Sequence, residues 1–178
     1  MDYYKLNKSV RGGELPTVDA NKRRQIDRLY LQMYPMLFEY ARSVMPNDAL
    51  AEEAVQETFV IACQKPDALL GSPNPPGWLV VTLKHVISNT RRKQQAAQSL
   101  LDDYIANRKA ELTAANDPIS PELLYGDIAR TEEFRLLKEL AVDGRSYQQM
   151  ARSRGISLEA CRKRVQRAKE ILRKKIGR

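Results

Sequence analysis

The stretch from Ser146 to Lys169 most constrains what this chain can fold into, because it has the pattern of two helices joined by a tight turn. Ser146 is a suitable N-cap for the first helix, and Gly155 supplies the permissive backbone of the turn. Ser157 can cap the second helix, in which apolar residues recur at steps of three and four. Those residues are Leu158, Cys161, Val165, Ala168 and Leu172. The pattern predicts a helix-turn-helix whose second helix packs along one stripe.

The opposite face of that second helix is polar and basic. It presents Glu159, Lys163, Gln166 and Glu170, flanked by Arg162 and Arg167. Residues 145–178 hold 12 lysines and arginines against two acidic residues, whereas residues 1–144 hold 18 against 20, so the net charge of +8 arises from this end of the chain. A basic stripe beside a helix-turn-helix predicts contact with a nucleic-acid backbone. A solvated basic helix end is the alternative that composition alone leaves open.

Two apolar patterns upstream predict a pair of packed helices. An apolar ridge at helical spacing begins near Asn21, and Pro35 inside it can kink or break the helix. A second helix is expected over residues 48–63, behind a loop that offers a cap. The outer side of that helix carries Glu52, Glu53, Gln56 and Glu57. The helix dipole accounts for acidic residues in a first turn, but Gln56 and Glu57 lie beyond it.

A segment rich in proline and glycine follows. Residues 65–77 hold four prolines and two glycines, which excludes a continuous helix and predicts a loop. Helical period returns from Trp78 to Lys93, and Trp78 is expected to face the core because it lies on the apolar side. The outer side of this helix carries the cations Lys84, Arg91, Arg92 and Lys93. Such cations can complement a helix end or bind phosphates.

The remaining patterns divide the chain into domains. Residues 1–22 have no sustained period and are expected to be a flexible leader. Residues 95–120 are polar and alanine-rich, so we expect a linker there between domains of residues 23–94 and 121–178. Two further helices are expected over residues 122–129 and 131–142. The predicted fold class is all-α, with two small helical domains joined by a flexible linker, the C-terminal one a helix-turn-helix.

Several function classes are disfavoured. No apolar run approaches the roughly 18 residues that cross a bilayer, and no secretion signal opens the chain, so we expect a cytoplasmic protein without a membrane partner. Cys63 and Cys161 stand far apart with only His85 as a histidine, so we expect core cysteines, no disulfide and no metal site. The chain lacks a glycine-rich phosphate loop and an acid–base pair. We therefore expect no enzyme activity, cofactor or small-molecule substrate.

Four stretches resemble the extracytoplasmic-function (ECF) sigma factors, the small two-domain promoter-recognition subunits of bacterial RNA polymerase. They are residues 29–41, residues 48–59 with their Val-Gln-Glu-Thr-Phe run, the Trp-Leu stretch of residues 78–93, and residues 146–168. They follow the family's order, and they align the first domain with region 2 and the second with region 4. The chain departs at Asn89, where the family commonly has Asp, and at His85, where Asn is frequent.

The resemblance implies a protein that binds core polymerase, reads two promoter elements and traps melted DNA. The acidic helix then docks on the clamp helices of the largest, β-type subunit, through Glu53, Gln56 and Glu57. The proline-rich loop before Trp78 then holds an unstacked base of the minus-ten element. The neighbouring phosphates are then bound by Lys84, Arg91, Arg92 and Lys93. An anti-sigma protein that covers these surfaces is a further possible partner.

For the minus-thirty-five element, the helix after Ser157 is expected to enter the major groove of promoter DNA. The candidate base contacts are Lys163 to guanine, Gln166 to adenine and Glu159 to cytosine. The candidate phosphate contacts are Arg162, Arg164, Arg167 and Lys169. Two other functions remain open: a helix-turn-helix regulator that binds duplex DNA without polymerase, and a helical adaptor or RNA-binding protein that uses the basic end differently.

Overall fold

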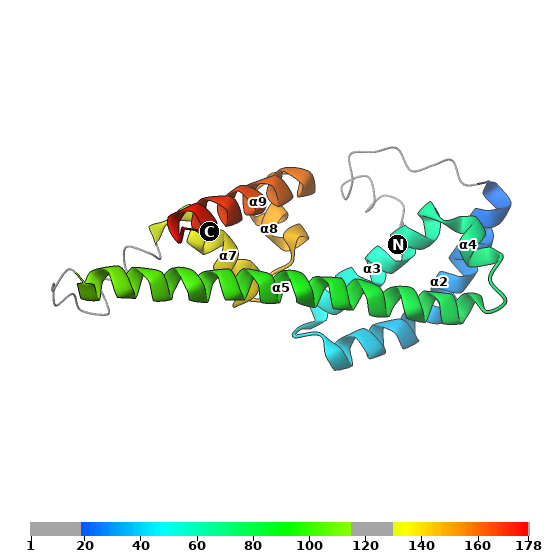
Figure 1. The fold of residues 1–178 in the computed structure, drawn as a ribbon. Coiled ribbons are helices and arrows are strands. Elements are labelled where there is room, and N and C mark those ends of the chain that lie inside the picture. The colour runs from blue at the N-terminus through cyan, green and yellow to red at the C-terminus, as the bar shows by residue number, and fades with distance from the viewer. Residues whose placement is uncertain (1–18, 115–129, 178) are drawn as a thin grey trace. The chain divides into compact units, whose positions relative to one another are not determined.

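The structure is a computed structural model that describes residues 19–114 and 130–177, and every regular element in those ranges is a helix (Figure 1). The helices are α2 (Ala20–Val44), α3 (Asp48–Gln64), α4 (Pro66–Leu70), α5 (Pro75–Ala114), α7 (Glu132–Ala141), α8 (Tyr147–Ser153) and α9 (Leu158–Lys175). The chain divides into two compact units, Met1–Arg91 and Arg92–Arg178, each with its own hydrophobic core. The all-α prediction is confirmed. No helix of the described ranges is long and apolar enough to cross a membrane.

The first core forms where α2, α3, α4 and the start of α5 pack together. The expected ridge of α2 is buried at Ile26, Met33, Leu37 and Ala41. The ring of Tyr30 packs edge-on against Phe59 of α3, with the ring centroids 4.9 Å apart. Asn47 caps α3, since its Oδ1 accepts a hydrogen bond from the Leu50 backbone N–H at 2.9 Å.

The helix α2 differs from expectation at two points. It continues through Pro35, so the proline neither ends nor divides it. It also begins at Ala20, so the expected leader of residues 1–22 overlaps its first turn, and the earlier part of that leader lies outside the described residues. The residues from Ala20 to Gln25 are mostly exposed, which explains why no apolar period marked the start.

The proline-rich segment is not a loop throughout. It contains the short helix α4, a loop of four residues and the start of α5. Pro66 opens α4 and Pro75 opens α5. A proline fits a first helical turn because its missing N–H has no partner there in any residue. Only residues 71–74 separate the two helices, and the Asn74 side chain accepts a hydrogen bond from the Gly77 N–H at 3.0 Å.

The helix α5 contributes residues to both cores. Leu83 is buried in the first core, whereas Ala97, Leu101 and Tyr104 are buried in the second. The expected linker therefore begins within a helix, since residues 95–114 belong to α5, and its remainder lies outside the described residues. The physical reason is an apolar stripe at helical spacing among polar neighbours, which buries one side of an otherwise hydrophilic stretch.

The second unit is completed by α7, α8 and α9. Ser146 and Gln149 form a capping box at the start of α8, and the Ser157 hydroxyl accepts from the Ala160 N–H at 3.1 Å to cap α9. Gly155 in the intervening turn has a φ of 61°, in the region that favours glycine. All five residues of the predicted α9 stripe are buried. The helix expected over residues 122–129 lies outside the described residues.

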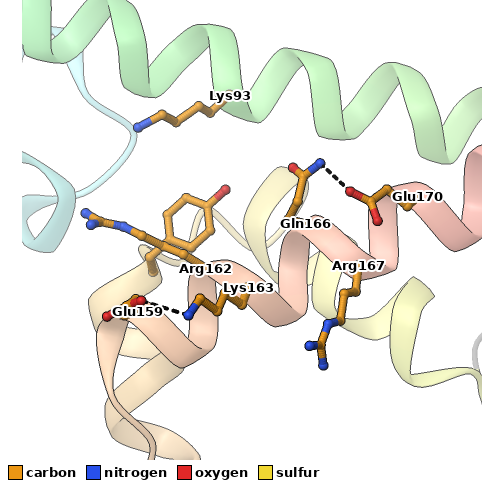
Figure 2. A pocket seen from close by; sticks show the side chains of 8 residues that line it. Lys93, Glu159, Arg162, Lys163, Gln166, Arg167 and Glu170 are labelled. Carbon is orange, nitrogen blue, oxygen red and sulfur yellow. Dashed lines mark hydrogen bonds and ion pairs between the residues drawn. The ribbon is translucent and has the colours of Figure 1, made fainter.

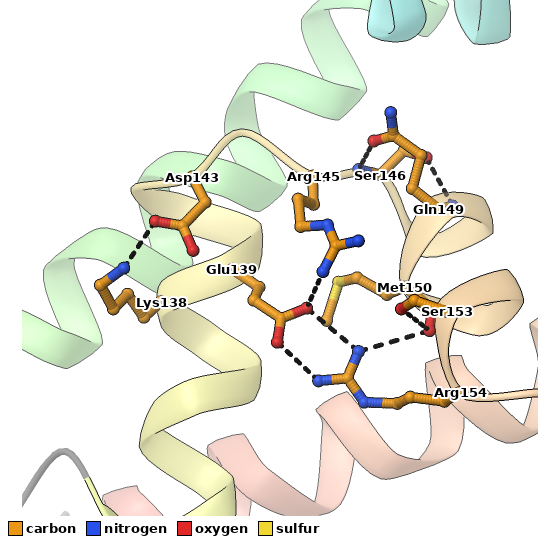
Figure 3. A network of polar contacts seen from close by, with 9 residues as sticks. All are labelled: Lys138, Glu139, Asp143, Arg145, Ser146, Gln149, Met150, Ser153 and Arg154. Carbon is orange, nitrogen blue, oxygen red and sulfur yellow. Dashed lines mark hydrogen bonds and ion pairs between the residues drawn. The ribbon is translucent and has the colours of Figure 1, made fainter.

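A carboxylate on α7 fastens the turn between α8 and α9 (Figure 3). Glu139 accepts from the two terminal guanidinium nitrogens of Arg154, at 2.7 and 3.0 Å, and from Arg145 at 3.0 Å. The side chains of Glu139 and Arg154 are only 20% and 22% exposed. The hydrogen bond from Arg154 holds the pKa of Glu139 below its usual range, against the opposing effect of burial. Two cations of the basic end therefore pair with a carboxylate of the protein itself.

Candidate nucleic-acid interface

The three candidate base contacts lie together on the exposed face of α9 (Figure 2). The Lys163 ammonium is 2.8 Å from a Glu159 carboxylate oxygen, and these side chains are 69% and 65% exposed. Gln166 donates from Nε2 to Glu170 at 2.9 Å. Each pair spans one helical turn, so the polar groups are oriented along the helix while their remaining donors and acceptors face solvent. The arrangement can present cationic, amide and carboxylate groups to a base edge.

The candidate phosphate contacts of α9 fall into two sets. Arg162, Arg164 and Arg167 are exposed. Lys169 is half-buried, and its pKa is lowered by that burial and then by the nearby charges of Arg173 and Lys93. Arg164 lies two residues from Arg162, about 200° around a helix, so the two guanidinium groups leave α9 on opposite sides.

An open cavity of about 560 Å³ runs along the exposed face of α9. Its lining comprises Lys93, Tyr147, Glu159, Arg162, Lys163, Gln166, Arg167 and Glu170. Lys93 comes from α5, in the part of that helix that belongs to the second unit. In the sequence Lys93 directly follows the minus-ten candidates Arg91 and Arg92, whereas the structure brings it together with the residues of α9.

The cations in the first unit have partners at the end of α2. The Lys84 ammonium lies 5.9 Å from the centroid of the Tyr40 ring, within the range of a cation–π contact. Arg91 donates a hydrogen bond to the Val44 carbonyl oxygen. Both cations remain exposed. Trp78 is partly buried against the first core, on the side where the apolar pattern put it.

The candidate polymerase-binding residues share one face of α3. Glu53, Gln56 and Glu57 are half-buried, and Gln56 donates to the exposed Glu52 at 3.1 Å. The Glu52 charge also adds to the burial that raises the pKa values of Tyr30 and Tyr34 on α2. The acidic face therefore continues onto the two tyrosines.

Tyr30 and Tyr34 lie on the apolar ridge of α2, so the sequence pattern alone indicates core residues rather than part of a polar face. Both are only half-buried. The signal that could have identified them is the phenol group, since a tyrosine commonly keeps its hydroxyl near water while its ring packs.

Neither cysteine faces this interface. Cys63 and Cys161 are free and buried, as expected of small core residues, and burial raises the pKa of the Cys161 thiol. Within the residues that the structure describes, no three histidine, cysteine, aspartate or glutamate side chains gather in a way that could hold a metal ion.

Comparison with protein families identifies the first unit. Residues 29–97 match the family model of sigma-70 region 2, a span that begins in α2, includes α3 and α4 and ends within α5. This part of the chain therefore resembles region 2 of the sigma-70 transcription initiation factors, and the match supports a role in RNA polymerase binding and promoter recognition. Searches of curated proteins and of solved structures return no match.

Proposed function

We propose that this protein is a sigma factor of the sigma-70 family and of the ECF type, which binds core RNA polymerase and directs promoter recognition, DNA melting and transcription initiation. The observation that supports this proposal is α9, a capped helix with a buried apolar stripe on one side and exposed basic and polar side chains on the other. A chain of 178 residues that pairs such a helix with a region 2 has the parts that the ECF resemblance implies, in the same order.

The first unit is proposed to dock on polymerase through α3. Glu53, Gln56 and Glu57 are half-buried, so their side chains are held close to the helix surface and need little ordering when a partner binds. Their proposed target is the clamp-helix region of the largest, β-type subunit. A polymerase partner would place the protein in the cytoplasm.

The first unit is also proposed to hold the melted minus-ten element. The loop of residues 71–74 lies directly before the helix that carries Lys84 and Arg91, so a base at the loop and phosphates along the helix are compatible with one strand. The cation–π contact of Lys84 with Tyr40 supports this role, because it steadies a long side chain without using its charge in an ion pair. Arg92, the first residue of the second unit, completes this proposed set.

The second unit is proposed to act as region 4, with α8 and α9 as a helix-turn-helix that reads the minus-thirty-five element. Lys163, Gln166 and Glu159 would contact base edges in the major groove. Arg162, Arg164, Arg167 and Lys169 would contact phosphates, which fix the register and carry most of the salt dependence. An anti-sigma protein that covers either surface would keep the factor inactive.

The test is reconstitution of transcription. Purified protein is mixed with core polymerase and a template that carries the DNA upstream of its own gene. We expect a stable complex and a defined start site for the wild type, and loss of both for the double variant Gln56→Ala/Glu57→Ala. Glu132→Gln, an exposed acidic residue in the first turn of α7, is the matched control and should leave both unchanged.

The same assay separates the competing function. A helix-turn-helix regulator would bind the duplex without polymerase and would be indifferent to the α3 substitutions. If no complex with core polymerase forms and the double variant matches the wild type, the sigma-factor proposal fails.

A further inference from the structure

Lys93 faces a cavity whose other walls come from α8 and α9 (Figure 2). It lies in the second unit, as do all the other residues of that lining. Arg162 and Arg167 reach the same cavity from α9. A lysine on α5 and arginines on α9 are therefore brought together by tertiary structure, although about 70 residues of chain separate them.

The charges around this cavity are not balanced. Its two carboxylates already have partners, because Glu159 pairs with Lys163 and Glu170 accepts from Gln166. Lys93, Arg162 and Arg167 make no hydrogen bond or ion pair with any residue that the structure describes. The lining thus keeps three cations that no carboxylate of the described chain neutralises.

The charge of Lys93 also acts on a cation that is not part of the lining. Lys169 is half-buried on α9, and the charges of Lys93 and Arg173 add to the burial that lowers its pKa. Lys93 is therefore close enough to repel another ammonium group. A bound anion would relieve this repulsion, which makes an anion the favoured occupant of the cavity.

We propose that Lys93 is a phosphate contact of the second unit, which acts with Arg162 on the backbone of the same DNA duplex whose bases α9 reads. The inference rests on the proposed role of α9 and extends it to a residue of α5. It also moves Lys93 out of the set of minus-ten cations, where its sequence neighbours had placed it.

A duplex phosphate fits this cavity better than a free anion does. The cavity is open and also lined by Lys163 and Gln166, so whatever fills it lies against the proposed base-reading groups. A DNA strand supplies a phosphate and a base edge at once, whereas inorganic phosphate or a nucleotide leaves part of this lining unused. The cations on either side of α9 then contact backbone while the centre of the face reads bases.

The experiment measures binding of the full chain to two fluorescent probes by anisotropy, over a series of salt concentrations. One probe is the duplex from upstream of the protein's own gene, and the other is a single strand of the same sequence. Lys93→Gln should weaken duplex binding about 3- to 10-fold and reduce the slope of log K against log salt by about one. Single-strand binding should not change. Lys93→Arg should restore the duplex affinity.

Two further variants sharpen the result. Lys84 is an exposed α5 lysine in the first unit, so Lys84→Gln is the matched control. It should weaken binding of the single strand more than binding of the duplex. The double variant Lys93→Gln/Arg162→Gln should lose less than the product of the two single losses, because both cations act on the same stretch of backbone.

Three outcomes would overturn the inference. One is that Lys93→Gln weakens binding of the single strand and leaves binding of the duplex unchanged, which would return Lys93 to the minus-ten set. Another is strictly multiplicative losses in the double variant. The third is that ATP or inorganic phosphate displaces the duplex at concentrations too low to act through ionic strength, and that this displacement requires Lys93. If the wild type binds no duplex, the proposed role of α9 fails as well, and polymerase-dependent transcription then shows whether the rest of the proposed function stands.

Discussion

Removal of the Glu139 carboxylate should destabilise the second unit far more than its position near the surface implies. In Glu139→Ala, Arg154 loses two hydrogen bonds of 2.7 and 3.0 Å and is left 22% exposed without its counterion. Hydrogen bonds to charged groups contribute about 1.5 to 3 kcal/mol. Arg145 is 40% exposed and can rehydrate, so we count only the Arg154 pair and expect a loss of about 2 to 3 kcal/mol.

The measurement is thermal unfolding followed by circular dichroism at neutral pH. For a unit of this size, the expected loss lowers the midpoint of the second unit's transition by roughly 10 °C or more. Duplex DNA affinity should fall in parallel, because Glu139 fastens the turn from which α9 starts.

The chain offers a matched control in the same unit. Lys138 and Asp143 form a pair of 2.6 Å, but their side chains are 47% and 36% exposed. Solvent screening reduces such a pair to at most about 1 kcal/mol, so Asp143→Ala should shift the midpoint by less than half as much. If the two variants unfold at the same temperature, the reasoning from burial is refuted.

The pH dependence of the same measurement has a defined sign. The pKa of Glu139 is lower in the folded protein than in the unfolded chain, so its contribution is fully present above the unfolded value of about 4.3. That contribution is lost as the pH falls through the folded pKa. The difference in unfolding midpoint between wild type and Glu139→Ala should therefore be constant from pH 7 to about pH 5 and should become smaller in more acidic solution.

Three other substitutions test separate parts of the structure. Glu170→Ala should leave folding intact and relax the preference for adenine at one position of a selected duplex pool, because the Gln166 amide loses the partner that orients it. Leu101→Ala should cost about 2 to 5 kcal/mol in chemical denaturation, whereas the exposed Ser99→Ala should cost almost nothing; equal stabilities would mean that this part of α5 is not in a core. Gly155→Ala should cost about 1 to 2 kcal/mol in the same assay from its positive φ alone, since an added Cβ meets no atom within 4 Å.

The sequence was most informative where a local pattern and a cap coincide. Ser157 and the apolar stripe that starts at Leu158 predicted α9 with the correct buried face, because helical period and capping act within a few residues. The acidic helix α3 was predicted for the same reason, behind its Asn47 cap. Whether its outer residues bind polymerase stays a prediction.

What the sequence could not provide depends on contacts between distant residues. Glu139 lies on α7 and Arg154, 15 positions later, lies just after the end of α8, so no local pattern marks them as partners. Lys93 follows Arg92 directly, yet tertiary packing assigns it to the cavity beside α9. The buried side of α5 at Leu101 was missed because its polar neighbours dominate the composition, and composition carries no information about direction.

The Glu139 network also sets an upper limit on counterion release. Of the 12 cations in residues 145–178, Arg145 and Arg154 are held by the Glu139 carboxylate, so at most ten remain for the proposed contacts with DNA phosphates. At about 0.9 released counterions per phosphate contact, the salt slope contributed by this end of the chain has a ceiling of about 9 rather than about 11. If this end of the chain binds DNA as proposed, its affinity is thus less sensitive to ionic strength than a count of its basic residues implies.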